Sequence, residues 1–168
     1  MTHDEDQTPG RILLIDDQPE LIEGFRLLLE DEGFEATVHP SLITLPLVLR
    51  SLNPDVILLD LSMPALSGQA LFATGVHRLL RTSAPIVLFS GRSPRELSEI
   101  TEEIGADGFV SKAQDLDDAI RRIRLWVMKR RASGVRPSLF CQLQPKSEGL
   151  TPNQQRNEGL TPNQKAKV

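Results

Sequence analysis

The chain has 168 residues, of which 39% are hydrophobic and 25% charged, so wholesale disorder and a membrane protein are excluded and one domain plus a tail is expected. Its one cysteine, Cys141, excludes an internal disulfide and a cysteine-based metal cage. The net charge of −4 is unevenly divided: residues 133–168 carry five basic and two acidic side chains, so residues 1–132 hold −7, which disfavours nucleic-acid binding there and suits a cation site.

Five short segments have the pattern of β-strands. Aliphatic runs without polar alternation are typical of strands buried on both faces of a parallel sheet. In chain order, the predicted strands are residues 11–15, 34–38, 56–59, 86–89 and 108–110, of which the second and the fifth have the weaker patterns.

The segments between these strands have apolar residues at helical spacing. In the first, Pro19 suits the first helical turn and Gly33 suits the helix end. Residues 93–96, Ser-Pro-Arg-Glu, are typical of a capping box with proline at the first helical position. The last helix is predicted from the spacing of Leu116, Ile120, Ile123 and Val127.

Two further helices each contain a residue that disfavours helix. Residues 41–53 are compatible with a helix only if Pro46 lies in its first turn. Residues 69–81 are predicted to be helical, although Gly75 weakens that helix. Strict alternation of strand and helix over residues 11–131 predicts an α/β fold, in which helices cover both faces of a doubly wound, five-stranded parallel sheet.

Both chain ends differ from this pattern. Residues 1–10 are expected to be flexible, and the polar residues 132–168 are expected to form a disordered tail. In this tail Glu-Gly-Leu-Thr-Pro-Asn-Gln occurs at 148–154 and again at 158–164. The amino terminus lacks a secretory signal pattern, and no aliphatic run is long enough to span a bilayer. We therefore expect a cytoplasmic protein with no membrane partner.

Acidic residues follow two of the strongest strands. Asp16 and Asp17 come directly after the first strand, and Asp60 follows the third. The carboxyl ends of neighbouring parallel strands meet at one edge of the sheet, where ligands bind in folds of this kind. Like charges at that separation repel, so the cluster requires a counter-cation or a shared proton. Ligands that are all oxygen favour Mg²⁺.

Two polar residues at the ends of the last strands complete this edge. Ser90 ends the fourth run and Lys112 follows the fifth. A hydroxyl and an ammonium beside a metal-bound carboxylate are suitable donors to phosphoryl oxygens. The set predicts phosphoryl transfer.

These motifs resemble the receiver domain of two-component response regulators, in its chemotaxis-type form. The resemblance covers residues 11–131 and rests on Asp16-Asp17, on Asp60-Leu61-Ser62-Met63-Pro64 with Gly68, on Ser90-Gly91, and on residues 105–112, Gly-Ala-Asp-Gly-Phe-Val-Ser-Lys. It implies a flavodoxin-like three-layer sandwich with strand order 2-1-3-4-5.

The resemblance also implies a role for each site residue. Asp60 would accept a phosphoryl group from the phosphohistidine of a histidine kinase or phosphotransfer protein. Asp17, Asp60 and the carbonyl of Ser62 would bind Mg²⁺ directly, with Asp16 acting through water. Lys112 would neutralise a phosphoryl oxygen. The family is a signalling switch with self-catalysed phosphorylation and dephosphorylation rather than an enzyme.

The response to phosphorylation is implied in the same way. Ser90 would move towards the phosphoryl group, and Phe109, at the aromatic switch position, would fill the space that Ser90 leaves. This motion would reach the outer face of the fourth and fifth helices, a possible homodimer or target surface. Ser62 and Arg92 occupy the positions at which the family tunes the phosphoryl lifetime.

Three features leave alternatives open or depart from the family. Ala113 stands where a cis-proline is common, so a trans bond is expected there. Phe109 has no hydroxyl and can switch only by packing. The last helix is strongly basic, and Leu125, Trp126 and Met128 lie off its apolar stripe, which indicates either a solvated helix end or a partner surface with an exposed tryptophan.

Several functions compete. The polar tail favours a single-domain regulator without an output domain, but residues 150–152, Leu-Thr-Pro, resemble the start of a helix-turn-helix output region, so the receiver fragment of a truncated DNA-binding regulator stays open. A metal-dependent phosphatase that forms an aspartyl phosphate would require an acid where Ser62 stands. A flavodoxin-like cofactor binder would require a phosphate-binding loop where Asp16 and Asp17 stand.

Overall fold

The computed structural model describes residues 8–63 and 75–133. Its strands are β1 Gly10–Ile15, β2 Phe34–His39, β3 Val56–Leu59, β4 Ile86–Ser90 and β5 Gly108–Ser111. They pair in parallel in the order β2-β1-β3-β4-β5, as expected. The helices are α1 Pro19–Asp31, α2 Leu45–Leu52, α4 Val76–Leu80, α5 Pro94–Ile104 and α6 Leu116–Ser133. All five predicted strands are confirmed.

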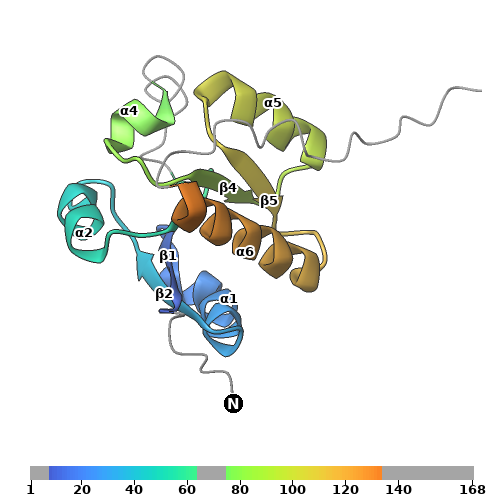
Figure 1. Cartoon of the computed structure of the whole chain (residues 1–168). Helices are drawn as coiled ribbons and strands as arrows, with labels where there is room; N and C mark the ends of the chain where they lie inside the picture. Colours follow the sequence, from blue (N-terminus) through green and yellow to red (C-terminus); the bar gives the residue numbers. More distant parts are fainter. Residues whose placement is uncertain (1–7, 64–74, 134–168) are drawn as a thin grey trace, which may run out of the picture.

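Helices cover both faces of the sheet and make a three-layer sandwich (Figure 1). Alternate residues of each strand point to opposite faces. One buried cluster joins the sheet to α1 and α6 and includes Ile22, Phe89 and Trp126. The other joins it to α2, α4 and α5 and includes Leu45, Leu97 and Phe109. The central strands are buried on both faces, which explains their unbroken aliphatic runs.

Several sequence expectations about helix ends are confirmed. Pro46 lies in the first turn of α2, where its missing N–H costs no hydrogen bond. Ser93 and Glu96 form the reciprocal capping box of α5, and Gly33 has the positive φ of 82° expected after a helix. Gly75 has φ 77° and ψ 140°, so a helix running through residue 75 is wrong; α4 begins at Val76, and residues 69–74 lie outside the described part.

Two expectations about α6 are wrong. Trp126 is 1% exposed and lies in the core, because α6 packs across the sheet with a broader apolar face than the predicted stripe. A Cβ at position 108 would lie 2.8 Å from Cζ2 of Trp126, so Gly108 makes room for the indole. Leu116 is 53% exposed because it is the first residue of the helix, before the helix crosses the strands. Leu125 and Met128 are exposed, as expected.

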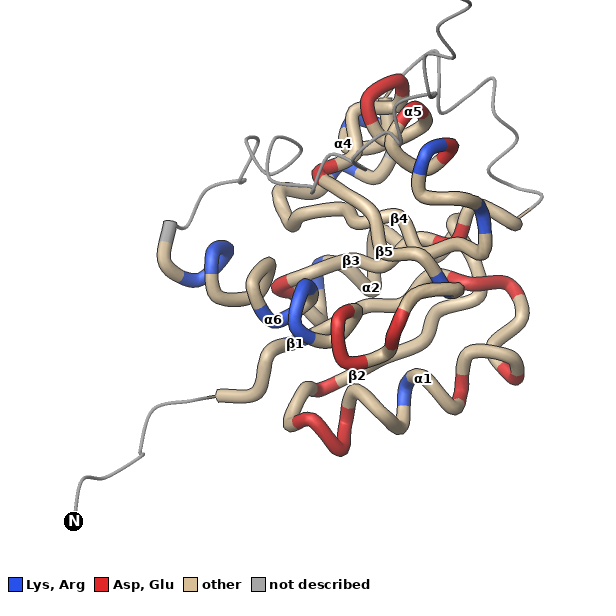
Figure 2. Tube along the Cα trace, turned by 90° about the vertical axis from the view of Figure 1, so that its right-hand side faces the viewer, with Lys and Arg blue, Asp and Glu red and all other residues tan. Residues whose placement is uncertain are grey.

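The basic residues of α6 lie close together along the helix, as Figure 2 shows. Arg121 and Arg122 pair with Asp118 of the same helix. Arg124 pairs with Glu32, the residue directly after α1, and Arg131 pairs with Asp55. The structure therefore supports internal ion pairing along this helix. No helix in residues 8–63 and 75–133 combines the length and apolar character needed to cross a bilayer.

Candidate functional site

Three carboxylates meet at the carboxyl edge of the central strands. The register pairs Ile15 of β1 with Leu59 of β3, so Asp16 and Asp60 leave the sheet side by side. The Asp60 N–H donates to the Ile15 carbonyl at 2.9 Å, which fixes this alignment. One oxygen each from Asp16, Asp17 and Asp60 lie within 4.8 Å of one another. The predicted convergence is confirmed.

Two of these carboxylates are buried. Asp16 is 3% exposed and Asp60 is 4% exposed, whereas Asp17 lies closer to the surface. Asp16 Oδ1 accepts a hydrogen bond from the Gln18 N–H at 2.9 Å, which orients that carboxylate. Asp60 Oδ1 is buried and has no hydrogen-bond partner among the described residues. A buried carboxylate oxygen that accepts no hydrogen bond is costly even beside an ammonium at 3.5 Å, so this oxygen is suited to bind a cation.

Lys112 supplies the positive charge of the cluster. Its Nζ lies 3.1 Å from Asp16 Oδ2 and 3.5 Å from Asp60 Oδ1. Its backbone N–H donates to the Ser90 carbonyl at 2.8 Å, so the end of β4 positions the lysine. Three carboxylates against one ammonium leave two negative charges uncompensated, the charge of one divalent cation. Oxygen ligands and this charge fit Mg²⁺.

Comparison with known proteins identifies this arrangement. The response regulator receiver domain is the family whose sequence pattern matches, over residues 12–124. The chain belongs to this family. The response regulator receiver fold therefore accounts for the sheet order, and the match includes Asp16, Asp17, Asp60, Ser90 and Lys112.

Similar proteins of known name are longer than the matched receiver region. The DNA-binding response regulator MtrA of Mycolicibacterium smegmatis is 33% identical over 116 residues, which cover 68% of this chain and 49% of MtrA. The sensory transduction protein RegX3 of the same organism is 33% identical over 118 residues, which cover 67% of this chain and 48% of RegX3. The chain thus spans about half the length of these curated relatives.

Solved structures share the receiver fold. The chemotaxis response regulator CheY4 of Vibrio cholerae aligns with a TM-score of 0.56 at 19% identity, over 71% of this chain and 99% of CheY4. A two-component response regulator of the LuxR family from Aurantimonas sp. aligns with a TM-score of 0.60 at 27% identity, over 73% of this chain and 87% of that one.

The remaining predicted site residues differ in burial: Ser90 and Phe109 are buried, and Ser62 and Arg92 are exposed. Ser90 ends β4 and is 2% exposed. Phe109 pairs in register with Leu88 and is 7% exposed, on the sheet face covered by α2, α4 and α5. Ser62 and Arg92 are exposed in the loops after β3 and β4. Pro64 and Gly68 lie outside the described residues.

The loop after β5 has the expected trans bond at Ala113, since no described residue follows a cis bond. The Ala113 N–H donates to Ser111 Oγ at 3.2 Å, and that hydroxyl donates to the Arg92 carbonyl at 3.4 Å. Ser111 thereby joins the loop that carries Lys112 to the loop that follows Ser90. Sequence reasoning passed over this serine as part of a longer motif.

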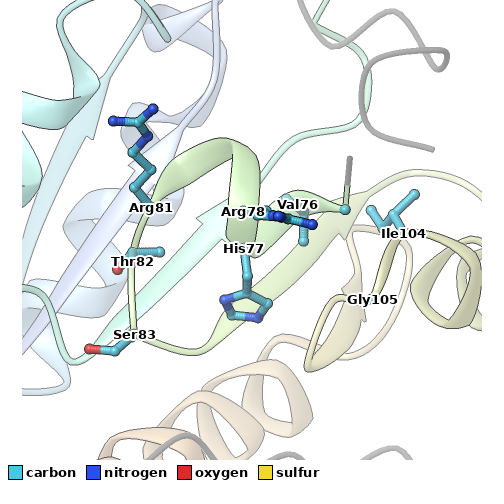
Figure 3. A pocket seen from close by; sticks show the side chains of 9 residues that line it. Val76, His77, Arg78, Arg81, Thr82, Ser83, Ile104 and Gly105 are labelled. Atoms are coloured by element: carbon cyan, nitrogen blue, oxygen red, sulfur yellow. The ribbon is translucent and has the colours of Figure 1, made fainter. Parts of the chain in front are cut away.

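A separate hollow of about 830 Å³ lies between α4 and the end of α5 (Figure 3). It is at the amino ends of β4 and β5, opposite the carboxylates, because its lining includes Ser83 before β4 and Gly105 before β5. Figure 3 shows the Arg81 side chain pointing away from His77, so the polar groups do not converge. His77 instead contacts Asp107 at 2.5 Å, which ties α4 to the sheet.

Proposed function

We propose that this chain is a phosphorylation-dependent signalling switch that accepts a phosphoryl group on Asp60 from the phosphohistidine of a histidine kinase or phosphotransfer protein. The observation that carries this proposal is the buried Asp60 carboxylate. It has an oxygen that accepts no hydrogen bond from the described residues, two neighbouring carboxylates and the Lys112 ammonium beside it. Family membership supports the same chemistry.

Asp17, Asp60 and the Ser62 carbonyl would hold Mg²⁺, with Asp16 contributing through water; the ion would neutralise phosphoryl charge. An Asp60 oxygen attacks phosphorus, the bond from phosphorus to the histidine nitrogen breaks, and the imidazole leaves with that electron pair. Lys112 donates to a phosphoryl oxygen and stabilises the charge that develops there. Attack of water on phosphorus later restores the free carboxylate, so the signal ends without a second protein.

Ser90 and Phe109 would transmit the phosphorylated state. They lie on neighbouring strands close to the site, Ser90 at the end of β4 and Phe109 paired with Leu88. We propose that the Ser90 hydroxyl moves to the phosphoryl group, that Phe109 repacks into the vacated space, and that α5 and α6 present the changed surface to a second copy or a target. Ser62 and Arg92 would set how long the phosphoryl group persists.

The downstream output has two candidates. A single-domain regulator without an output module is the first. The second is the receiver part of a longer DNA-binding regulator, and it is favoured by the name of MtrA and by the half-length match. In either case we expect no nucleic acid to bind the described part directly, because four arginines of α6 pair with its own carboxylates.

Intact mass after incubation with Mg²⁺ and acetyl phosphate tests the proposal. We expect one added phosphoryl group, lost in Asp60→Asn and when Mg²⁺ is removed by chelation. Asp60 Oδ1 accepts no hydrogen bond from the described residues, whereas both oxygens of the neighbouring Asp16 accept one, from the Gln18 N–H and from Lys112. Asp115→Asn in the adjacent loop is the control and should label normally, since asparagine also caps helices. Labelling of Asp60→Asn at the wild-type level would overturn the assignment.

A further inference from the structure

An aromatic ring lies beneath the ammonium of Lys112. Phe89 precedes Ser90 on β4, so their side chains point to opposite faces of the sheet. Phe89 belongs to the core cluster under α1 and α6 and is 6% exposed. The Lys112 Nζ lies over its ring, 5.1 Å from the centroid. At this separation a cation is attracted to the negative face of the ring.

A second ring fixes the first. Phe25 of α1 stacks on Phe89 with a centroid separation of 4.6 Å and an interplanar angle of 21°. Stacked rings attract each other beyond the area they bury. Because Phe25 is anchored in α1 and Phe89 in β4, the orientation of the ring that faces Lys112 is set by the packing of the helix on the sheet.

This contact positions the Lys112 ammonium and leaves its positive charge and its N–H donors available to the carboxylates. A carboxylate in the same place would neutralise the ammonium and take one of its three N–H donors, whereas an aromatic face does neither. Lys112 donates a hydrogen bond to Asp16 Oδ2 at 3.1 Å, and its ammonium forms an ion pair with Asp60 Oδ1 at 3.5 Å. A free lysine side chain populates many rotamers, so fixing it in one position costs conformational entropy. An additional attractive contact offsets part of that cost.

We propose that Phe89, supported by Phe25, is a positioning residue that holds the Lys112 ammonium at the phosphoryl-accepting carboxylate. This inference rests on the proposed function of Asp60. Phe89 acts through Lys112 and does not contact the reacting atoms. Replacing the ring by an aliphatic side chain keeps an apolar core but removes the attractive face.

Phosphorylation rates of the full chain provide the first test. With Mg²⁺ and acetyl phosphate, Phe89→Leu should react roughly threefold to tenfold more slowly than wild type. Phe34→Leu is the matched control: Phe34 is also 6% exposed, lies in the same cluster and carries a cation, Arg124, at 4.9 Å, but on the outer strand β2. It should be destabilised in a similar way and keep its rate.

A double variant separates positioning from general destabilisation. In a Lys112→Met background, Phe89→Leu should cause no further loss, since the group it positions is gone. An equal loss in both backgrounds, or a wild-type rate in Phe89→Leu, would overturn the proposal.

A spectroscopic measurement on the wild type needs no core substitution. The Hε protons of Lys112, assigned with Lys112→Arg, should be shifted upfield by the ring current of Phe89. Unshifted protons would exclude the contact even if Phe89→Leu did not fold. Absence of any phosphorylation in the wild type would instead refute the function of Asp60 and leave this upfield shift in place, so the two failures are distinguishable.

Discussion

Asp60 combines burial with an excess of negative charge. Its carboxylate is 4% exposed, and the Lys112 ammonium beside it is closer to Asp16 than to Asp60. Without a divalent cation the folded chain holds three neighbouring carboxylates against one ammonium. Such a site costs stability in the folded state and is retained for the chemistry it allows.

Asp60→Asn should therefore stabilise the protein when Mg²⁺ is absent. Removing one of three clustered charges is expected to raise the free energy of unfolding by about 1 kcal/mol. Added Mg²⁺ should stabilise the wild type and leave the variant nearly unchanged, because a ligand stabilises only the fold that binds it. Urea unfolding followed by the fluorescence of Trp126, the single tryptophan, measures both. A variant less stable than wild type without Mg²⁺ would contradict the repulsion.

Acidic residues cap and begin α6. Asp115 Oδ1 accepts hydrogen bonds from the N–H groups of Asp117 and Asp118 at 2.9 and 3.2 Å, so it caps the helix. Asp118 in turn accepts from Arg121 and Arg122, one turn along. The hydrogen bond from Arg121 and the charge of Arg122 hold the pKa of the Asp118 carboxyl below its usual value of 3.8.

This lowered pKa gives α6 a pH dependence. A carboxyl whose pKa is depressed by folding contributes stability above its unfolded pKa, near 4, and loses it as pH falls through the lower folded value. Asp118→Asn should thus be less stable than wild type at pH 6, and the difference should shrink below about pH 4. Asp117→Asn, on the exposed side of the same turn, is the control. Urea unfolding midpoints at each pH measure this. A stability difference between wild type and Asp118→Asn that did not change with pH would contradict the lowered pKa of Asp118.

At the scale of the whole molecule, one arginine joins the end of the last helix to the start of the first strand. Arg131 donates to the carbonyls of Thr8 and Pro9 at 2.6 and 2.8 Å and pairs with Asp55 at 2.8 Å. The same Asp55 oxygen accepts the Arg11 N–H at 2.9 Å. This cluster lies at the amino ends of β1 and β3, opposite Asp60, and connects segments more than 100 residues apart in sequence.

Arg131→Met should destabilise the protein by about 2 kcal/mol, because it leaves the buried Asp55 carboxylate with one partner fewer. Arg95→Met, which removes only an exposed ion pair with Glu99 on α5, should change stability much less and serves as control. Since the cluster is remote from Asp60, the phosphorylation rate of Arg131→Met should equal that of the wild type at a temperature where both are folded. A large loss of rate in the folded variant would show that the two edges are coupled.

Much of the fold and the site could be predicted from local pattern. Unbroken aliphatic runs indicated strands, and the chain-order alternation with helices indicated a parallel sheet. Parallel strands place their carboxyl ends at one edge, so the sequence alone predicted that Asp16, Asp17, Asp60 and Lys112 lie together. Trp126 was predicted to be exposed because helical spacing identifies only one apolar stripe. The width of the buried helix face depends on the strand residues that pack against it. Here Gly108, which has no side chain, leaves space for the indole of Trp126.

The sequence by itself determined the elements, their order and the chemical groups at the sheet edge, because these depend on local periodicity and on the topology of parallel strands. Only the tertiary structure decided which side chains support those groups. The stack of Phe25 on Phe89 beneath Lys112, and the contact of Arg131 with Thr8 and Asp55, join segments far apart in the chain. Their pairing depends on how each helix lies on the sheet, which is settled by packing of the whole core rather than by the pattern of any one segment.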